Sequence, residues 1–329
     1  MLAVPSKDRG DFVGAGNYIP RAGLALGLTV ALSLGAATAT ATAATTAKQA
    51  KAAGTICWSG PHPKLAARIS RGVLAALHGR SSVVSVKVDD TVHHVICDYH
   101  QDRQYYSASV VKATILAALL RKLMGENRYL SSAQQALAKE MITESSNSAA
   151  SALWAEVGRH SLQHFLKLAK MKQTVLGPGG YWGLTLITAH DEMLLLNLLT
   201  SKNSVLDAPS RTYELSLMAR VIPSQRWGVP AGAPADVTVH VKNGWLPYPG
   251  KDWHINSIGS FSGHHRNYMI VVLTAGNPSM TYGVDTVQDI AEVINRDLNE
   301  GVTAVIPASA PYPSWGTPDE QIGVLPGRS

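Results

Sequence analysis

Two hydrophobic periods alternate along the chain and separate predicted strands from predicted helices. Valine alternates with polar residues over 84–88, which is the two-residue period of a half-buried strand. Asp89 and Asp90 then supply a turn and residues 93–99 return, so this region predicts a β-hairpin.

Strand character comes back in the last third of the chain. Residues 237–242 again alternate valine with polar side chains. Residues 255–261 and 268–275 are two further predicted strands, and the second is a nearly continuous apolar run. The pattern therefore predicts five strands in two groups.

Helical spacing occupies the ends and the middle of the same region. Pro63 opens a helix that Gly79 ends, and a closing helix carries Val287, Ile290 and Ile294 on one face. Between the strand groups, the glycine-rich residues 176–186 are predicted as a loop. Amphipathic helical stretches are predicted over 131–143, 148–157, 162–169 and 190–199.

This order predicts an α/β fold of the α+β kind. Strands close in sequence pair as antiparallel neighbours, so we expect a five-stranded antiparallel sheet flanked by terminal helices, with an inserted all-helical lobe. The cleft between the lobes is where chemistry is expected. The predicted boundaries are a sheet lobe of 57–106 and 223–300, a helical lobe of 107–222, and a Pro/Gly-rich tail of 301–329.

Composition and charge exclude several classes of protein. The chain has 329 residues, 46% hydrophobic and 16% charged, which is typical of a globular protein. Its formal charge of +6 is mild, and no stripe of Lys and Arg with interleaved aromatics is present, so no nucleic-acid partner is expected. A mildly basic surface is compatible with an anionic cell wall.

The N-terminus predicts export. Lys7, Arg9 and Arg21 precede an apolar run over 22–37, which small-residue A-x-A sites follow. We expect residues 1–43 to be a cleaved signal peptide and 44–56 a linker, giving a secreted protein with no stable membrane span. The alternative is a retained anchor, for which the apolar run is short.

Two cysteines, Cys57 and Cys97, are the only ones in the chain. In an exported protein such a pair more often forms a structural disulfide than a reactive or metal site, so a bridge is predicted.

Three short motifs carry candidate chemistry. In the first, Ser109 and Lys112 are three residues apart on a predicted helix whose cap would be Ser107, so the amine can reach the hydroxyl and act as its base. Taken alone, the spacing is expected about once by chance. The second is Ser145-Ser146-Asn147, which alone reads as a polar turn between helices.

The third motif, Lys242-Asn243-Gly244, ends a predicted strand and by itself is an ordinary strand-to-turn signal. In combination and in this order, the three motifs resemble the Ser-x-x-Lys, Ser-Asp-Asn and Lys-Thr-Gly motifs of class A β-lactamases and penicillin-binding peptidases. The resemblance extends over about 57–300.

The resemblance implies a role for each matching residue. Ser109 would be the acylated nucleophile and Lys112 its base, Ser145 would relay a proton to the leaving nitrogen, and Asn147 would hold the substrate amide. Lys242 would supply positive potential and keep the Lys112 amine less basic.

Further roles follow from positions near the third motif. The backbone N–H groups of Ser109 and of Trp245, which follows Gly244, would form the oxyanion hole. Arg226 matches an Arg-x-Gly-x-Pro segment where some class A enzymes hold the substrate carboxylate, although a structural surface role is an equal alternative.

The sequence departs from the family pattern at three places. Ser146 replaces an aspartate that is structural in the family, and Asn243 replaces a hydroxyl residue that helps bind the substrate carboxylate. Between Glu156 and Asp191 no acidic residue occurs, although class A enzymes carry there the glutamate that activates the deacylating water. Slow deacylation is therefore predicted.

We expect a secreted, monomeric serine hydrolase that acts through an acyl-serine on β-lactams or D-amino-acid cell-wall peptides, without metal or cofactor. The alternatives are a D,D-peptidase or penicillin-binding protein, and a non-catalytic sensor of cell-wall peptide or β-lactam. An α/β-hydrolase elbow is excluded because the best candidate, over 259–263, has Phe261 at its centre, and the histidines show no metal-ligand spacing.

Overall fold

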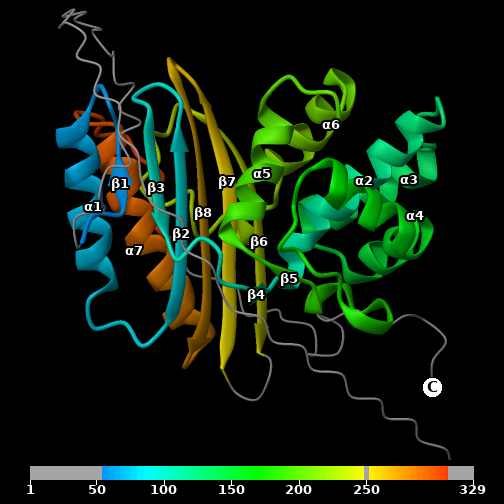
Figure 1. The fold of residues 1–329 in the computed structure, drawn as a ribbon, viewed down its shortest axis with the longest axis horizontal. Coiled ribbons are helices and arrows are strands. Elements are labelled where there is room, and N and C mark those ends of the chain that lie inside the picture. Colours follow the sequence, from blue (N-terminus) through cyan, green and yellow to red (C-terminus); the bar gives the residue numbers. More distant parts are fainter. Residues whose placement is uncertain (1–53, 248–251, 310–329) are drawn as a thin grey trace, which may run out of the picture. The chain divides into compact units, whose positions relative to one another are not determined.

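The computed structural model describes residues 54–247 and 252–309, and a six-stranded antiparallel sheet forms their centre (Figure 1). The strand order is β1-β3-β2-β8-β7-β6. A separate pair, β4 and β5, makes a small second sheet. The strands are β1 (Cys57–Trp58), β2 (Val83–Asp90), β3 (Val95–Tyr99), β4 (Tyr105–Tyr106), β5 (Leu186–Ile187), β6 (Thr238–Pro247), β7 (Trp253–Gly263) and β8 (Arg266–Asn277).

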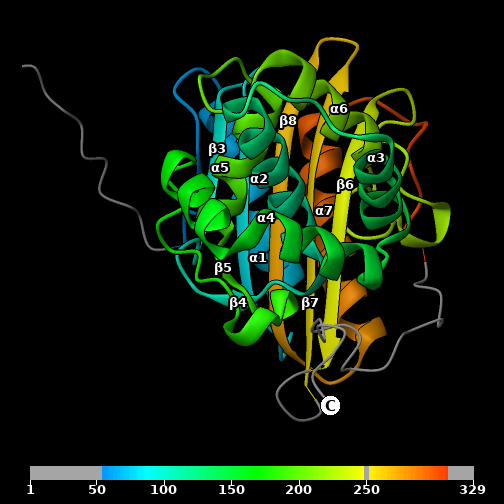
Figure 2. The same ribbon diagram turned by 90° about the vertical axis from the view of Figure 1, so that its right-hand side faces the viewer.

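Helices cover both faces of the sheet. The terminal helices α1 and α7 pack together on one face, and the helices between β4 and β6 lie on the other (Figures 1 and 2). This is the predicted architecture of a sheet with an inserted helical lobe. The helices are α1 (Pro63–Leu77), α2 (Val111–Gly125), α3 (Ser132–Lys139), α4 (Asn147–Leu168), α5 (Ala189–Thr200), α6 (Ala208–Met218) and α7 (Met280–Leu298).

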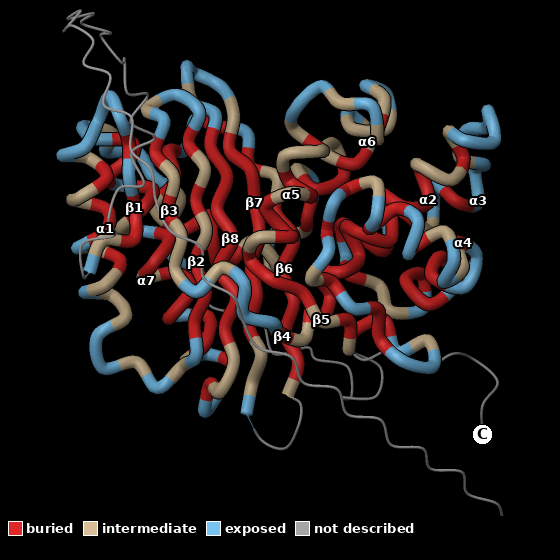
Figure 3. The backbone as a smooth tube through the Cα atoms, in the orientation of Figure 1, coloured by how far each residue is buried: buried red, intermediate tan, exposed pale blue. Residues whose placement is uncertain are grey.

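The sheet separates two hydrophobic cores, which explains why its central strands are buried on both faces (Figure 3). On β8, Val271 and Leu273 join the core of the helical lobe, whereas Ile270 and Val272 join the core beneath α1 and α7. Successive side chains of a strand point to opposite faces, so a strand buried on both sides reads as a continuous apolar run.

The main sheet has one strand more than the five predicted, and the short β4–β5 pair was not predicted either. The additional strand, β1, has two residues and pairs with β3 in a register that places Cys57 opposite Cys97. Two residues cannot show an alternating pattern, so no strand could be predicted there. The predicted Cys57–Cys97 disulfide is present and fastens this edge strand to the sheet.

Two local predictions were also wrong. Asp89 and Asp90 do not form the turn of the first hairpin, because both pair with β8 and the turn falls on 91–94. Ser107 does not cap a helix: its backbone is already helical and its side chain makes no capping hydrogen bond. Its backbone N–H instead donates to the carbonyl of Thr185, 2.8 Å away.

The two predicted helices over 148–157 and 162–169 are one element, α4, interrupted at Gly158. That glycine has a φ of 75°, a value that favours glycine. The predicted loop over 176–186 contains two short 3₁₀ turns, η3 (Pro178–Gly180) and η4 (Trp182–Leu184), before β5 begins.

The predicted signal peptide (1–43), most of the linker and the end of the tail lie outside the described residues. At the start of the tail, Val305 forms an isolated bridge with Pro234. Within 54–247 and 252–309, no helix is both long and apolar enough to cross a bilayer.

Candidate active site

Ser109 lies in a tight turn between the two lobes. It occupies the 3₁₀ turn η1 (Ala108–Val110), directly before α2, and is 7% exposed. The preceding Ala108 has a φ of 46°, a left-handed value that is unfavourable for a residue with a Cβ atom. Such strain persists where the surrounding structure fixes the backbone, as at a functional side chain.

Gly244 on β6 brings the third motif against this turn. A Cβ atom at position 244 would lie 2.6 Å from the Ser107 carbonyl oxygen and 2.9 Å from the Ser109 backbone nitrogen. Only glycine permits so close an approach of two backbones. Trp245 is the next residue, so the backbone N–H groups of Ser109 and Trp245 belong to neighbouring segments.

The Lys112 side chain, one helical turn after Ser109, is fully buried. Its Nζ atom donates to the backbone oxygen of Ser145 at 2.6 Å and to Oδ1 of Asn147 at 2.7 Å, and it lies 3.2 Å from Oγ of Ser145. A neutral amine has two N–H bonds and one lone pair. The two short contacts use both N–H bonds, which leaves the lone pair to accept a proton from a hydroxyl.

Burial lowers the pKa of Lys112 well below its ordinary value, and the charge of Lys242 lowers it further. Desolvation, which the sequence did not reveal, is the larger cause. A lowered pKa favours the neutral form of the amine, which is the form that can act as a general base.

Ser145 connects the two lysines. It ends the π-helical turn η2 (Glu140–Glu144) in a left-handed conformation, with a φ of 60°. Its hydroxyl accepts a hydrogen bond from Nζ of Lys242 at 3.0 Å. The hydroxyl therefore lies between an amine that can take up a proton and a cation that polarises it.

Lys242 is 1% exposed, and its burial lowers the pKa of its amine from 10.5 to about 7. Besides the hydroxyl of Ser145, the amine donates to the Asn243 carbonyl at 3.1 Å. Hydrogen bonds thus join Lys112 of α2, Ser145 at the end of η2, Asn147 of α4 and Lys242 of β6. Together with Ser109 of η1, one helical turn before Lys112, we call these residues the Ser109 site.

Asn243 points away from the Ser109 site. Its Nδ2 group donates to the carbonyls of Gln225 at 2.9 Å and of Trp227 at 2.8 Å. Because strand side chains alternate, Asn243 faces the side of the sheet opposite to that of Lys242. Asn243 therefore fixes the backbone on either side of Arg226. It does not take the place of the family hydroxyl that helps bind the substrate carboxylate.

Arg226 itself is half-buried and donates from Nη1 to the Ala219 carbonyl at 2.9 Å. It lies close to His240, which precedes Lys242 by two residues and shares its face of β6. Burial lowers the pKa of His240, and the Arg226 charge contributes in the same direction.

Three tryptophans, Trp182, Trp227 and Trp245, are core residues. Trp227 and Trp245 pack against each other beneath the sheet, with ring centroids 5.9 Å apart. Trp182 is completely buried, and the Lys112 Nζ atom lies over its ring, 4.7 Å from the centroid. Motif spacing could not have revealed this contact, because Trp182 comes from the distant loop before β5.

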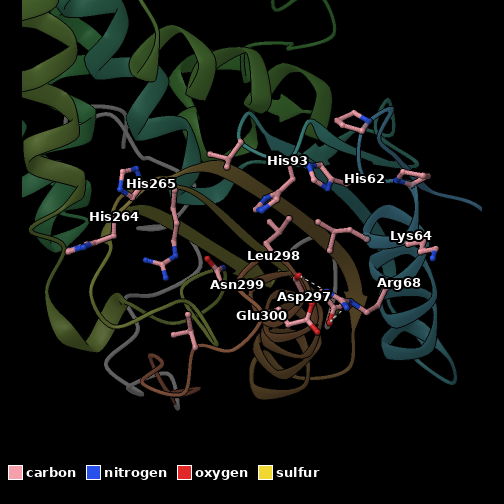
Figure 4. A pocket seen from close by; sticks show the side chains of 16 residues that line it. His62, Lys64, Arg68, His93, His264, His265, Asp297, Leu298, Asn299 and Glu300 are labelled. Atoms are coloured by element: carbon pink, nitrogen blue, oxygen red, sulfur yellow. Dashed lines mark hydrogen bonds and ion pairs between the residues drawn. The ribbon is translucent and has the colours of Figure 1, made fainter.

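Away from the Ser109 site, a cavity of about 780 Å³ lies between the start of α1, the end of α7 and two hairpin turns (Figure 4). His264 and His265 lie on one side of it, and Lys64 and Arg68 on the other. Arg68 pairs with Asp297 and Glu300. No Ser, Cys or Thr is among the described residues that line this cavity, so it offers no nucleophile for acyl transfer.

Metal ligands do not cluster in the described part of the chain: no group of three or more His, Cys, Asp or Glu side chains could hold an ion there.

Comparisons with known proteins identify the family of the chain. The profile of the Beta-lactamase enzyme family matches residues 132–298, just over half of the chain. This segment includes the second and third motifs and begins after Ser109 and Lys112. No curated protein matches the chain.

Solved structures share the fold at low identity. A class A beta-lactamase from Bacteroides cellulosilyticus has 18% identity and a TM-score of 0.62, over 71% of this chain and 98% of that one. The TLA-3 extended-spectrum beta-lactamase has 16% identity and a TM-score of 0.63, over 70% and 98%. A PBP-A mutant, solved as its acyl-enzyme complex with penicillin G, has 14% identity and a TM-score of 0.61, over 70% and 96%.

The family that the three motifs predicted is therefore confirmed, since the profile matches the sequence and the neighbours share its sheet and helical lobe. The chain belongs to the beta-lactamase enzyme family.

Proposed function

We propose that this protein is an extracytoplasmic serine hydrolase that opens the amide bond of β-lactams or D-amino-acid cell-wall peptides through an acyl-Ser109 intermediate. The observation that carries the proposal is the hydroxyl of Ser145, which lies 3.2 Å from Nζ of Lys112 and 3.0 Å from Nζ of Lys242. A hydroxyl between a neutral amine and a cation is a proton relay next to a nucleophile.

Acylation would proceed in two proton transfers. Oγ of Ser109 attacks the carbonyl carbon while its proton moves to Nζ of Lys112. The proton then passes through the Ser145 hydroxyl to the amide nitrogen as the C–N bond breaks. The products are an ester on Ser109 and a free amine, which for a β-lactam stays attached to the opened ring.

The carbonyl oxygen would become negative during this step. Backbone N–H groups at Ser109 and Trp245 are candidates to stabilise it, and their proximity follows from the contact of Gly244 with η1. Asn147 would orient the substrate amide, although its Oδ1 atom also accepts from Lys112.

Recognition of the substrate carboxylate would differ from that of relatives with a Lys-Thr-Gly motif. Asn243 is turned toward residues 225–227, so the carboxylate would depend on Lys242 and on the neighbouring Arg226.

Deacylation would be slow. Hydrolysis of the ester needs a base to take a proton from water, and the sequence between Glu156 and Asp191 contains no carboxylate. The slow step favours a long-lived adduct with penicillins.

Export is part of the proposal. The disulfide of Cys57 and Cys97 is typical of an oxidising compartment, and the N-terminal sequence has the pattern of a signal peptide.

Intact-mass spectrometry of the protein with a fluorescent penicillin tests the function. We expect a one-to-one adduct that persists for hours and is absent from Ser109→Ala. Ser132→Ala, an exposed serine at the start of α3, is the matched control and should label like the wild type.

The outcomes separate the candidates. An adduct that clears in seconds identifies an efficient β-lactamase, and a persistent one a penicillin-binding peptidase or sensor. If the wild type forms no adduct, or if Ser109→Ala still forms one, the proposed nucleophile is wrong.

A further inference from the structure

Trp182 covers the amine of Lys112. The Nζ atom lies 4.7 Å from the centroid of the indole ring, and both side chains are completely buried. The ring therefore lies against one side of the amine that would serve the acyl-enzyme from α2.

The indole is held in place from two directions. Its Nε1 group donates to Oγ of Ser151 on α4 at 3.1 Å. The segment that carries it is attached to the turn before Ser109, since the backbone N–H of Ser107 donates to the Thr185 carbonyl at 2.8 Å. A large aromatic ring with a satisfied N–H is a rigid barrier.

The same loop lacks a carboxylate. A water molecule that hydrolyses the ester must lose a proton as its oxygen bonds to the acyl carbon. The ester C–O bond then breaks and Oγ of Ser109 regains a proton. With no acidic residue in the loop, the amine of Lys112, one helical turn from Ser109, would be the base for this reaction, and the water would have to reach it.

We propose that Trp182 is a positioning residue that keeps water away from the Lys112 amine and thereby sets the lifetime of the acyl-enzyme. The inference rests on the proposed acyl-serine chemistry and adds a cause for its slow last step: the loop places an apolar ring where water would have to stand.

Removal of the ring tests this. Trp182→Ala leaves space next to the amine that a polar wall can fill with water. We expect the adduct to form at a similar rate and to clear roughly tenfold faster or more, since general-base assistance is worth at least that factor. The readout is the decay of the penicillin adduct, followed by intact mass after removal of free penicillin.

Two further variants distinguish exclusion of water from the Lys112 amine from a general loss of packing in the helical lobe. Trp182→Phe keeps a ring over the amine and should retain a lifetime within about twofold of the wild type, because an aromatic face still excludes water. Trp154→Ala makes a cavity in the same core of the helical lobe and should destabilise the protein without shortening the lifetime.

The pH profile gives an independent readout. Water beside the amine reduces its desolvation, so the Lys112 pKa should rise in Trp182→Ala. The acid limb of the acylation rate should then move to higher pH. A merely structural tryptophan would leave that limb unchanged.

The decisive outcomes differ from those of the proposed function. If the wild type forms no adduct, the acyl-serine proposal fails. If Trp182→Ala forms the adduct but it lives as long as in the wild type, or if Trp154→Ala shortens it equally, the shielding role is wrong.

Wild-type protein alone gives a second test, should Trp182→Ala fail to fold. Hydroxylamine should release the native adduct at least tenfold more slowly than the urea-unfolded adduct, because the folded site excludes small polar nucleophiles. Equal release rates would overturn the inference.

Discussion

Two groups of fully buried titratable side chains contrast within this protein. In the Ser109 site, Lys112 and Lys242 are almost completely buried, and each amine has hydrogen-bond acceptors within 3.2 Å. On α5 and α6, Glu192 and Glu214 are 0% exposed, and neither carboxyl oxygen of either residue has a partner among the described residues.

Burial moves both groups toward their neutral forms. It lowers the pKa values of the two lysines and raises those of Glu192 and Glu214 well above their ordinary value, the Asp191 charge adding to the shift of Glu192. A perturbed pKa is therefore not by itself a sign of catalysis. What distinguishes the lysines is that the hydroxyl of Ser145 connects them, and that Lys112 lies one helical turn after Ser109.

The two groups should also affect stability in opposite directions. For the acids, the folded pKa lies above the unfolded value, so their stabilising contribution is complete below the ordinary pKa of 4.5 and is lost as the pH rises. For Lys242, the folded pKa lies below the unfolded value. Its contribution is complete above 10.5 and is lost as the pH falls toward about 7.

Removal of the Lys112 amine should have the largest effect. We expect Lys112→Met to slow acylation of Ser109 by roughly 10³-fold or more, because the nucleophile loses its base. The second-order rate of adduct formation with fluorescent penicillin measures this. Lys122→Met, at a half-buried position on the same helix outside the Ser109 site, should label normally. A normal rate in Lys112→Met would remove the distinction between the two groups.

A change of the charge at position 242 should alter the pH dependence. The Lys242 amine loses its charge above about pH 7, which weakens capture of an anionic substrate on the alkaline side. Lys242→Arg keeps its charge, so relative to its own maximum it should retain roughly tenfold more activity near pH 9. Acylation rates from pH 5 to about 10 provide the measurement. If the alkaline limb of the acylation rate were unchanged in Lys242→Arg, that limb would reflect the titration of another group.

The smallest expected effect concerns the isolated acids. Glu192→Gln and Glu214→Gln should leave acylation unchanged and flatten the loss of stability with rising pH. Each acid contributes at most about 1.4 kcal/mol per pH unit to this slope. Urea unfolding at several pH values measures it.

Glu126→Gln, an exposed residue, is the control for these two variants and should not change the slope. If either buried variant impaired acylation, Glu192 or Glu214 would belong to the catalytic network, and the acids would not differ in role from the two lysines.

Much of the fold could be read from local patterns. The alternation over 84–88 and 237–242 predicted strands correctly, because one face of a strand meets a core. The same reasoning missed β1, whose two residues carry no period, and misplaced the first hairpin turn. Asp89 and Asp90 look like turn residues, but both pair with β8, so tertiary pairing overrode the local preference.

The candidate site shows the same division. Ser109, Lys112, Ser145 and Lys242 could be named because each motif is a local pattern of a few residues. The direction of Asn243 and the cover of Lys112 by Trp182 could not. They depend on which face of β6 each residue occupies and on the path of a loop some 70 residues from α2.

The sequence alone thus predicted the longer strands, the terminal helices, the cysteine pair and the candidate reactive side chains, since periodicity and motif spacing are properties of neighbouring residues. The tertiary structure decided which buried charges act together. Desolvation and hydrogen bonding depend on groups that meet only after the sheet and the helical lobe close on each other, and these forces separate the connected lysines from the isolated acids.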